Sequence, residues 1–461
     1  MSGSFEKLDV PPTLVSFAVT TEKIQNIVSN EFKCAGSEVI LIKPKYGADG
    51  LPEIKSLLEV YKTVTELLRS GLALSAYTPT YGGIAEAVMK MCFGNNYGFT
   101  FEKGISLDEI FSYCYGGFIL EMNKSVNVGK TIGFVTEQRL MEFDGKCFKT
   151  SELLDIYENK LEKVFPCNIE TPDVPMQTFN YSCTAQERKA PAVKCARPKV
   201  LIPVFPGTNC EFDSAKVMND AGAEAKIMVI NNLTSSGIAS SIESFAKELA
   251  TSQMVFIPGG FSGGDEPDGS GKFITAFFRN AAIKEQVTEL LEKRDGLMCG
   301  ICNGFQALIK LGLVPYGKIV DTDENSPTLT FNTIGRHQSR IVRTRIASNK
   351  SPWLAKTKPG EVYSVPISHG EGRFIASESL IAELAKNGQI ATQYVDFSDN
   401  ATADIHFNPN NSAYAIEGIT SPDGRVFGKM GHSERTGFGL YKNVPGNYDI
   451  KMFEGAVEYF K

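Results

Sequence analysis

From residue 198 onward, short continuous runs of apolar residues alternate along the chain with segments in which apolar residues recur at helical spacing. Four runs are continuous enough for buried strands: Val200–Phe205, Ala225–Ile230, Met254–Ile257 and Leu297–Ile301. Between two of them, helical spacing is shown by Ile238, Ile242, Phe245 and Leu249. Strands that alternate with helices in this way predict a doubly wound α/β domain around a mostly parallel sheet. Ligands of such domains gather at the carboxyl ends of the strands.

The first 165 residues alternate strands and helices less regularly. An apolar stripe between Pro52 and Gly71 predicts a core-packing helix, and residues 117–122 have the composition of a strand. Gly82 and Gly83 stand at the entry to another helix. Their backbone N–H groups could hold a phosphate, or the paired glycines could serve only the turn.

A proline-rich stretch with little apolar periodicity separates these two regions. Its prolines are Pro166, Pro172, Pro175, Pro191 and Pro198, and the pattern predicts a linker. After Gly312 the pattern changes to shorter strands and turns, and Asp423-Gly424 is typical of a hairpin turn. We therefore expect an α+β domain at 1–165, a linker at 166–197 and the α/β domain at 198–461.

One predicted turn between a strand and a helix carries a clear chemical signal. The run at 297–301 leads to Cys302, and helical spacing begins at Phe305. Gly300 and Gly304, two residues to either side, permit a strained backbone and a close approach of strand to helix, as in a nucleophile elbow. Because a helix N-terminus beneath the sulfur favours the thiolate, Cys302 is the candidate nucleophile.

Two other interpretations of Cys302 stay open at this point. A lone buried cysteine commonly does no more than pack a core. Cys299 and Cys302 also have the spacing of a redox pair, although Cys299 falls inside the apolar run and is expected to point into the core. The presence of catalytic partners elsewhere in the chain discriminates between these interpretations.

A histidine and a glutamate near the C-terminal end could be those partners. His432 and Glu434 are two residues apart, so in extended backbone they lie on one face and the carboxylate can orient the imidazole. A histidine presented in this way is a natural general base for Cys302. His337 and His406 have no partner spacing for a metal, so we interpret them as structural and predict no metal in this site.

Two loops at the carboxyl ends of predicted strands could complete the site, at 206–210 and 258–265. The later Gly271-Lys272 lacks the preceding glycine and the following Ser or Thr of a phosphate-binding Walker A loop. We interpret the glycines of the second loop, Gly259 and Gly260 among them, as exposing backbone N–H groups toward an oxyanion beside the thiolate. A simple turn is the alternative.

Composition narrows the class of protein. Of 461 residues, 42% are hydrophobic and 22% charged, and the net charge is -6, which is ordinary for a globular protein and gives no case for nucleic acid or anionic membranes. The sequence shows neither an apolar run of roughly 20 residues, as a membrane span needs, nor a signal peptide. The ten cysteines are expected to be reduced thiols of a cytoplasmic protein.

Several motifs together carry a resemblance to a known family. Gly300–Gln306, Pro258–Gly260 and His432–Glu434 resemble a class I glutamine amidotransferase domain. The segments 206–211, 260–265 and 368–373 further resemble the glutaminase domain of the large, fused phosphoribosylformylglycinamidine synthase family over about 198–461. Residues 1–165 resemble, less sharply, the C-terminal part of its second aminoimidazole-ribonucleotide-synthetase-like half. The chain is therefore expected to be a C-terminal portion of such an enzyme.

This resemblance implies a reaction and a set of site residues. Cys302 would attack the side-chain amide of glutamine, His432 would shuttle the proton and Glu434 would orient His432. Oxyanion and substrate contacts are implied at Gly259, Gly260, Asn303, Gln306, Ser368 and His369. The glutaminase domain would need no cofactor, and the ammonia would serve a synthetase site that aminates formylglycinamide ribonucleotide with ATP and Mg²⁺ in de novo purine synthesis.

The sequence departs from the family pattern at two places. Ser433 stands where the family often has proline, between the triad histidine and glutamate. The segment 75–83 lacks the acidic residue expected of an active synthetase half. Residues 1–165 are therefore expected to be non-catalytic, and a docking module is the alternative function from a different class. Such a module would associate with the rest of the enzyme or form an oligomer.

Overall fold

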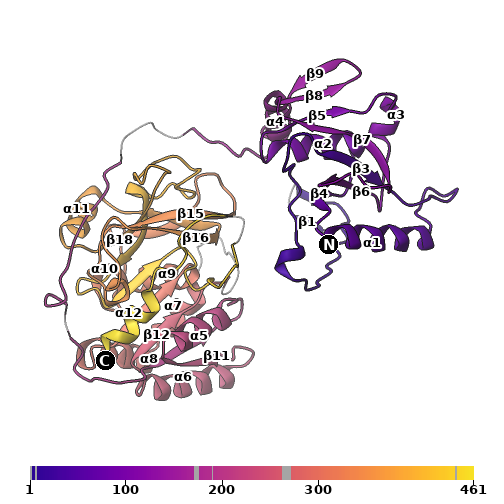
Figure 1. Ribbon diagram of the computed structural model, residues 1–461. Helices are drawn as coiled ribbons and strands as arrows, with labels where there is room; N and C mark the ends of the chain where they lie inside the picture. The colour runs from indigo at the N-terminus through magenta and orange to yellow at the C-terminus, as the bar shows by residue number, and fades with distance from the viewer. Residues whose placement is uncertain (1–2, 6–7, 171–175, 189, 262–270, 442–443) are drawn as a thin grey trace. The chain divides into compact units, whose positions relative to one another are not determined.

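The chain divides into two compact units, Met1–Phe165 and Pro166–Lys461, which differ in colour in Figure 1. This computed structural model describes residues 1–461 except 1–2, 6–7, 171–175, 189, 262–270 and 442–443. In the described residues, no helix combines the length and the apolar character that crossing a bilayer requires.

In the described part of the first unit, seven strands form one sheet in the order β4-β6-β3-β7-β5-β8-β9. Their bounds are β3 Glu38–Ile42, β4 Ala73–Tyr77, β5 Gly98–Phe101, β6 Phe118–Met122, β7 Lys130–Thr136, β8 Leu140–Phe143 and β9 Lys146–Lys149. The helices are α1 Ile54–Arg69, α2 Gly83–Phe93, α3 Leu107–Phe111 and α4 Thr150–Asn159, with a short 3-10 turn η1 at Ile24–Asn26. A separate antiparallel pair is formed by β1 Gly3–Phe5 and β2 Leu8–Val10.

Alternate residues of β3 pack two separate cores. Val39 and Leu41 join the core beneath α2, whereas Ile40 and Ile42 join the core beneath α1. Because successive side chains of a strand point to opposite faces, helices cover both faces of this sheet. The helix predicted between Pro52 and Gly71 is confirmed as α1.

At the entry to α2, the two glycine N–H groups are hydrogen-bonded within the chain, whereas a phosphate site needs them free. The Gly82 N–H donates to the Glu86 carboxylate at 2.8 Å, and the Gly83 N–H donates to the Thr80 carbonyl at 3.0 Å. Since the chain itself provides acceptors for both groups, the paired glycines serve the turn.

In the second unit, nine strands form one sheet in the order β11-β10-β12-β13-β20-β19-β18-β15-β16 within the described residues. Their bounds are β10 Lys199–Val204, β11 Glu224–Val229, β12 Met254–Ile257, β13 Leu297–Ile301, β15 Gln338–Ile346, β16 Val362–His369, β18 Ile390–Tyr394, β19 Ile416–Thr420 and β20 Val426–Lys429. A smaller antiparallel pair consists of β14 Thr328–Phe331 and β17 Glu371–Ile375.

The longer helices of this unit are α5 Glu211–Asp220, α6 Ser235–Leu249, α7 Lys272–Phe278, α8 Ala281–Thr288, α9 Asn303–Leu311, α11 Glu378–Lys386 and α12 Met452–Tyr459. The shorter ones are the π-helix η2 Glu289–Lys293, α10 Leu313–Tyr316 and the 3-10 turns η3 Pro352–Leu354 and η4 Ala413–Ala415. Phe256 of β12 packs against Trp353 and Phe453 on one face, while Ile257 meets Gly304 of α9 on the other. Helical segments therefore cover both faces here, as the doubly wound pattern predicts.

The sheet is mixed rather than mostly parallel. Strands β11, β10, β12, β13 and β20 pair in parallel, whereas β20, β19, β18, β15 and β16 pair antiparallel. The antiparallel half lies after Gly312, where the sequence pattern predicts shorter strands, but β15 and β16, with nine and eight residues, are the longest strands of the sheet. Gly424 has a positive φ in the turn between β19 and β20. An α/β fold is confirmed, and its sheet is half antiparallel.

The segment predicted as a linker is partly bound to the second unit. The Phe179 N–H donates to the Gln393 side chain and the Tyr181 N–H to the Ala347 carbonyl, both at 2.8 Å. Further along, the Cys195 N–H donates to the Phe460 carbonyl at 2.7 Å. Extended backbone can bind in this way without apolar periodicity, so the sequence pattern does not reveal it.

Candidate active site

Cys302 occupies a strained turn between β13 and α9. Its φ is 53° and its ψ is -107°, a region that residues other than glycine rarely adopt. A Cβ on Gly300 would lie 2.6 Å from the Gly304 backbone, and a Cβ on Gly304 would lie 2.1 Å from the Ile257 carbonyl oxygen. Both glycines therefore permit the close packing of strand and helix that the elbow needs.

The sulfur of Cys302 lies beside a histidine and two backbone segments. A Cβ on Gly259 would lie 2.6 Å from Cε1 of His432 and 3.3 Å from Cβ of Cys302, so both side chains meet at that glycine. The Cys302 Sγ lies 3.7 Å from the Ser368 carbonyl oxygen, and the residue is 5% exposed. The Cys302 thiol therefore lies in a narrow site with little access to solvent.

The structure brings His432 and Glu434 together as a buried pair. The Nδ1 of His432 lies 2.6 Å from Oε1 of Glu434. Burial opposes a charge on His432, but the Glu434 carboxylate, with smaller effects from the Cys210 and Cys302 thiols, outweighs it and raises the pKa of His432 well above its usual value. Burial likewise opposes ionisation of Glu434, yet His432 holds the pKa of that carboxyl below its usual value.

The second ring nitrogen of His432 is available for proton transfer. Nε2 is buried and has no hydrogen-bond partner in the described residues. Since the Cys302 thiol is among the groups that raise the pKa of His432, the imidazole is well placed to hold a proton taken from that thiol.

The predicted oxyanion residues lie at two neighbouring backbone segments. Gly260 has a φ of 146°, and a Cβ there would lie 2.5 Å from the Gly207 carbonyl oxygen, so this glycine packs the two predicted loops together. Asn303 is the first residue of α9, where backbone N–H groups point along the axis toward the N-terminus. The rest of the glycine motif, 262–265, lies outside the described residues.

Gln306 and Ser368 contact other protein groups near the thiol. The Gln306 side chain accepts from Nδ2 of Asn303 at 2.9 Å and donates to the Glu371 carbonyl at 2.6 Å. Its polar atoms therefore tie α9 to the segment after β16. The Ser368 hydroxyl lies 3.1 Å from Nε2 of His337, a residue that sequence reasoning treated as structural and that has no local motif to reveal its position.

His369 is a buried and neutral imidazole beside the site. It is 2% exposed, and neither ring nitrogen has a hydrogen-bond partner in the described residues. Burial, with smaller effects from His432 and His337, lowers the pKa of His369 to about 3. A neutral ring can donate one hydrogen bond and accept another, so it can bind a polar ligand without a net charge.

Cys210 is a further site residue that the sequence placed in a loop without assigning a role. Its Sγ lies 3.8 Å from Nδ1 of His432 and 3.0 Å from Nη2 of Arg435. Within the described residues, Cys210, His432 and Glu434 form the group whose ligand atoms lie close enough to hold a metal, all within 4.8 Å. Hydrogen bonds from Arg435 and between His432 and Glu434 account for this arrangement, and a site without metal remains our prediction.

Cys299 lies away from this chemistry. It is fully buried in the core of the second unit, as predicted from its place in the apolar run. Burial raises its thiol pKa well above the usual value, despite an opposing effect of Lys429. Because thiol exchange requires the thiolate, this environment disfavours the redox-pair interpretation.

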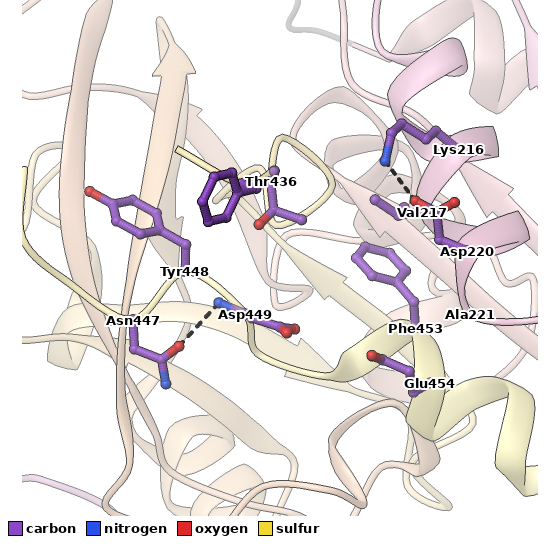
Figure 2. A pocket seen from close by; sticks show the side chains of 12 residues that line it. Lys216, Val217, Asp220, Ala221, Thr436, Asn447, Tyr448, Asp449, Phe453 and Glu454 are labelled. Atoms are coloured by element: carbon purple, nitrogen blue, oxygen red, sulfur yellow. Dashed lines mark hydrogen bonds and ion pairs between the residues drawn. The ribbon is translucent and has the colours of Figure 1, made fainter. Parts of the chain in front are cut away.

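A pocket elsewhere in the second unit is lined by none of the predicted site residues. It has a volume of about 420 Å³ and lies beside α5, α12 and the segments 436–438 and 447–449, as Figure 2 shows. Lys216 and Asp220 form an ion pair of 2.6 Å at its edge. None of the described residues that line it is a cysteine or a histidine, so the candidate chemistry stays at Cys302.

Comparison with known proteins places the second unit in a family. Residues 197–460 match the CobB/CobQ-like glutamine amidotransferase domain. The chain is 34% identical to the phosphoribosylformylglycinamidine synthase subunit PurQ of Methanococcus maripaludis over 284 residues, which cover 57% of this chain and 97% of that protein. The PurQ subunit of Trichormus variabilis is 34% identical over 255 residues, which cover 55% of this chain and 95% of that protein.

A solved structure is also similar to the chain. A chain of the PurLQS structure from Thermotoga maritima matches with a TM-score of 0.42 and 24% identity, covering 57% of this chain and 100% of its own. The synthetase-like character of residues 1–165 remains a prediction. The family match and the relatives' identities show that this chain belongs to the CobB/CobQ-like glutamine amidotransferase family, among the relatives of the PurQ subunits of phosphoribosylformylglycinamidine synthase.

Proposed function

We propose that the chain hydrolyses glutamine through Cys302, His432 and Glu434 and supplies ammonia to a phosphoribosylformylglycinamidine synthase. The observation that carries this proposal is the strained elbow of Cys302 meeting His432 at Gly259. A nucleophile beside a base that is itself oriented by a third group is the arrangement required for acyl transfer.

The first half of the reaction forms a thioester. Nε2 of His432 takes and holds the proton of the Cys302 thiol, and Sγ then attacks the side-chain carbonyl carbon of glutamine. Backbone N–H groups at Gly260 and Asn303 stabilise the oxyanion, a contribution of ~10²–10³ in rate for each donor. His432 then donates its proton to the amide nitrogen, and ammonia leaves.

The second half hydrolyses that thioester. His432, neutral after giving up its proton, takes a proton from water, which attacks the carbonyl carbon and releases glutamate from Cys302. Glu434 stabilises the imidazolium at both stages through the 2.6 Å contact at Nδ1. The raised pKa of His432 has this purpose, because the proton must remain on the ring while the thiolate reacts.

His369 and the carbonyl of Ser368 bind the amino-acid end of glutamine in this proposal. The free ring nitrogens of His369 support a polar ligand, and the Ser368 carbonyl lies 3.7 Å from the nucleophile. Gln306 acts indirectly, by holding the segment at Glu371 against α9. This assignment differs from a direct substrate contact for Gln306.

The relatives support a proposal for the destination of the ammonia. They are named as subunits of phosphoribosylformylglycinamidine synthase, and the sequence resembles the fused form of that enzyme. We propose that this chain associates with a synthetase portion, in the cytoplasm, that uses ATP and Mg²⁺ to aminate formylglycinamide ribonucleotide. The unit Met1–Phe165 serves association rather than catalysis.

A chloroketone analogue of glutamine tests the nucleophile. Its carbon should alkylate Cys302 with loss of chloride, which mass spectrometry of peptides locates, and excess glutamine should protect the thiol. Cys302→Ser should lose labelling, and also glutaminase activity measured with a synthetase portion added in trans, whereas the matched variant Cys299→Ser should retain both. Labelling of Cys299 in place of Cys302 would refute the proposal and support a redox pair.

A further inference from the structure

A buried ion pair lies directly behind the His432 loop. Lys429, the last residue of β20, is fully buried, and its Nζ lies 3.6 Å from Oε1 of the equally buried Glu417 on β19. The same Nζ donates to the Ser433 hydroxyl at 2.7 Å. None of these three residues takes part in the proposed mechanism. Lys429 and Glu417 contact the loop that carries His432, and Ser433 lies within that loop.

The contacts of this pair flank His432 on both sides. Glu417 accepts the backbone N–H of Gly431 at 2.6 Å, the residue just before His432. Lys429 binds the side chain of Ser433, the residue just after it. The two side chains therefore fix the chain at the positions adjoining the imidazole.

The same lysine also contacts the nucleophile through its backbone. The Cys302 N–H donates to the Lys429 carbonyl at 2.9 Å, within the parallel pairing of β13 and β20. One residue is thus bonded to the elbow by its main chain and to the His432 loop by its side chain. A shift of Lys429 changes the placement of His432 relative to Cys302.

Stability alone does not explain why charges occupy this place. Desolvation of two charges offsets much of their attraction, so apolar replacements of a buried ion pair are often neutral or stabilising. Glu417 has a further partner in the Thr392 hydroxyl, which holds its second carboxylate oxygen. A network that satisfies each member in one geometry specifies that geometry.

We propose that Lys429 is a positioning residue, paired with Glu417, that holds His432 and Glu434 in line with Cys302 through Ser433. This inference rests on the proposed glutaminase function. It also assigns a role to Ser433, which stands where the family often has proline. The hydroxyl accepts the lysine's hydrogen bond, a contact that a proline ring does not offer.

Two variants separate positioning from stability. Ser433→Ala removes the acceptor and leaves Lys429 and Glu417 paired. The double variant Lys429→Met/Glu417→Gln removes both charges without leaving one unpaired. Each should retain a melting temperature close to that of the wild type, whereas Lys429→Met alone should lower it because Glu417 would be buried without its partner.

Alkylation kinetics with the chloroketone provide the readout, in the full chain. The maximal inactivation rate of Ser433→Ala and of the double variant should fall ~10- to 100-fold, since small misplacements of reacting groups cost this much. The concentration for half-maximal rate should stay unchanged, because the glutamine pocket is not altered. The low-field NMR signal of the proton between His432 and Glu434 should shift or broaden in both variants.

Arg425, the residue just before β20, offers a control. Its buried guanidinium pairs with Asp423 at 2.7 Å and with Asp295 at 3.3 Å. Arg425→Met should lower the melting temperature but leave the inactivation rate and the low-field NMR signal of wild type.

The outcomes distinguish this inference from the proposed function. If the wild type is alkylated at Cys302 but the two test variants react at the same maximal rate, only the inference is overturned. A change confined to the half-maximal concentration would also overturn it, since Lys429 would then shape the pocket. If Cys302 of the wild type is not alkylated, both proposals fall.

Discussion

His369 makes the stability of the second unit depend on pH in a direction opposite to His432. Burial lowers the pKa of His369 from 6.5 to about 3. Because the folded pKa lies below the unfolded one, its contribution to stability is complete above 6.5 and is lost as pH falls toward the folded pKa. His432 has a raised folded pKa, so its contribution is present below 6.5 and is lost as pH rises through the folded pKa.

The size of the His369 effect follows from its two pKa values. At about pH 5 the unfolded chain carries nearly a full proton on His369, whereas the folded chain carries almost none. Relative to about pH 7, this difference lowers the free energy of unfolding by about 2 kcal/mol. His432 offsets part of that loss in the wild type, so comparison with a variant is needed to isolate it.

We expect His369→Asn to remove this pH dependence. The variant loses packing at every pH, but that loss is independent of pH, so the stability difference between wild type and variant isolates the titration. Acidification from about pH 7 to about pH 5 should shift this difference by about 2 kcal/mol in favour of the variant. His369→Gln, of different volume, should show a different absolute stability but the same shift.

Tryptophan fluorescence during urea unfolding measures this quantity in the relevant unit alone. The chain has one tryptophan, Trp353, which is fully buried in the core of the second unit. A stability difference that stays constant with pH would refute the reasoning, because it would mean that His369 titrates alike in the folded and unfolded chain.

Three other predictions concern the site itself. Glu434→Gln should lower the pKa of His432, measurable by NMR titration, and reduce glutaminase turnover by roughly 10²–10⁴-fold as the oriented base is lost; unchanged turnover would exclude the triad role. Gly259→Ala should slow alkylation of Cys302 by ~10²-fold with normal circular dichroism, because its Cβ would lie 2.6 Å from the His432 ring; wild-type kinetics would contradict the contact. The chain alone should hydrolyse glutamine slowly or not at all and should form no formylglycinamidine product. Glutamine turnover should rise when a synthetase portion is added in trans, while Cys302 should be labelled with or without it. Full amidotransfer by the isolated chain would contradict this coupling.

The sequence predicted best those features that depend on neighbouring residues. The elbow required a strand, a helix and two glycines within a few residues of Cys302, and the structure has that turn with a positive φ. The spacing of His432 and Glu434 predicted their contact, and the two side chains lie 2.6 Å apart, but the extended backbone predicted there is wrong. Ser433 and Glu434 lie in a turn in which the Arg435 N–H donates to the His432 carbonyl at 3.2 Å. Local geometry fixes such relations before the rest of the fold is known.

Features that depend on partners distant in sequence were less predictable. The run at 166–197 looked like a linker because its bonds to residues such as Gln393 and Ala347 use backbone groups, which every sequence possesses. The antiparallel half of the sheet was missed for a related reason. Strand direction depends on pairing that composition does not encode, and a helix, α11, precedes β18 in this half as helices precede strands in the parallel half.

The burial and the contacts of Lys429 were the hardest features to predict from the sequence. A lysine at the end of an apolar strand is read from sequence as the point where the strand reaches solvent, because lysine is almost never fully buried unless paired. Its partner Glu417 lies on β19, across a hairpin, and its other contact, Ser433, seemed only a departure from the family's proline. Only the pairing of β19 with β20 beside β13 shows that these three residues form one buried network behind His432. Ser433, which the sequence showed only as a departure from the family pattern, is therefore the residue through which the structure connects the ion pair to His432.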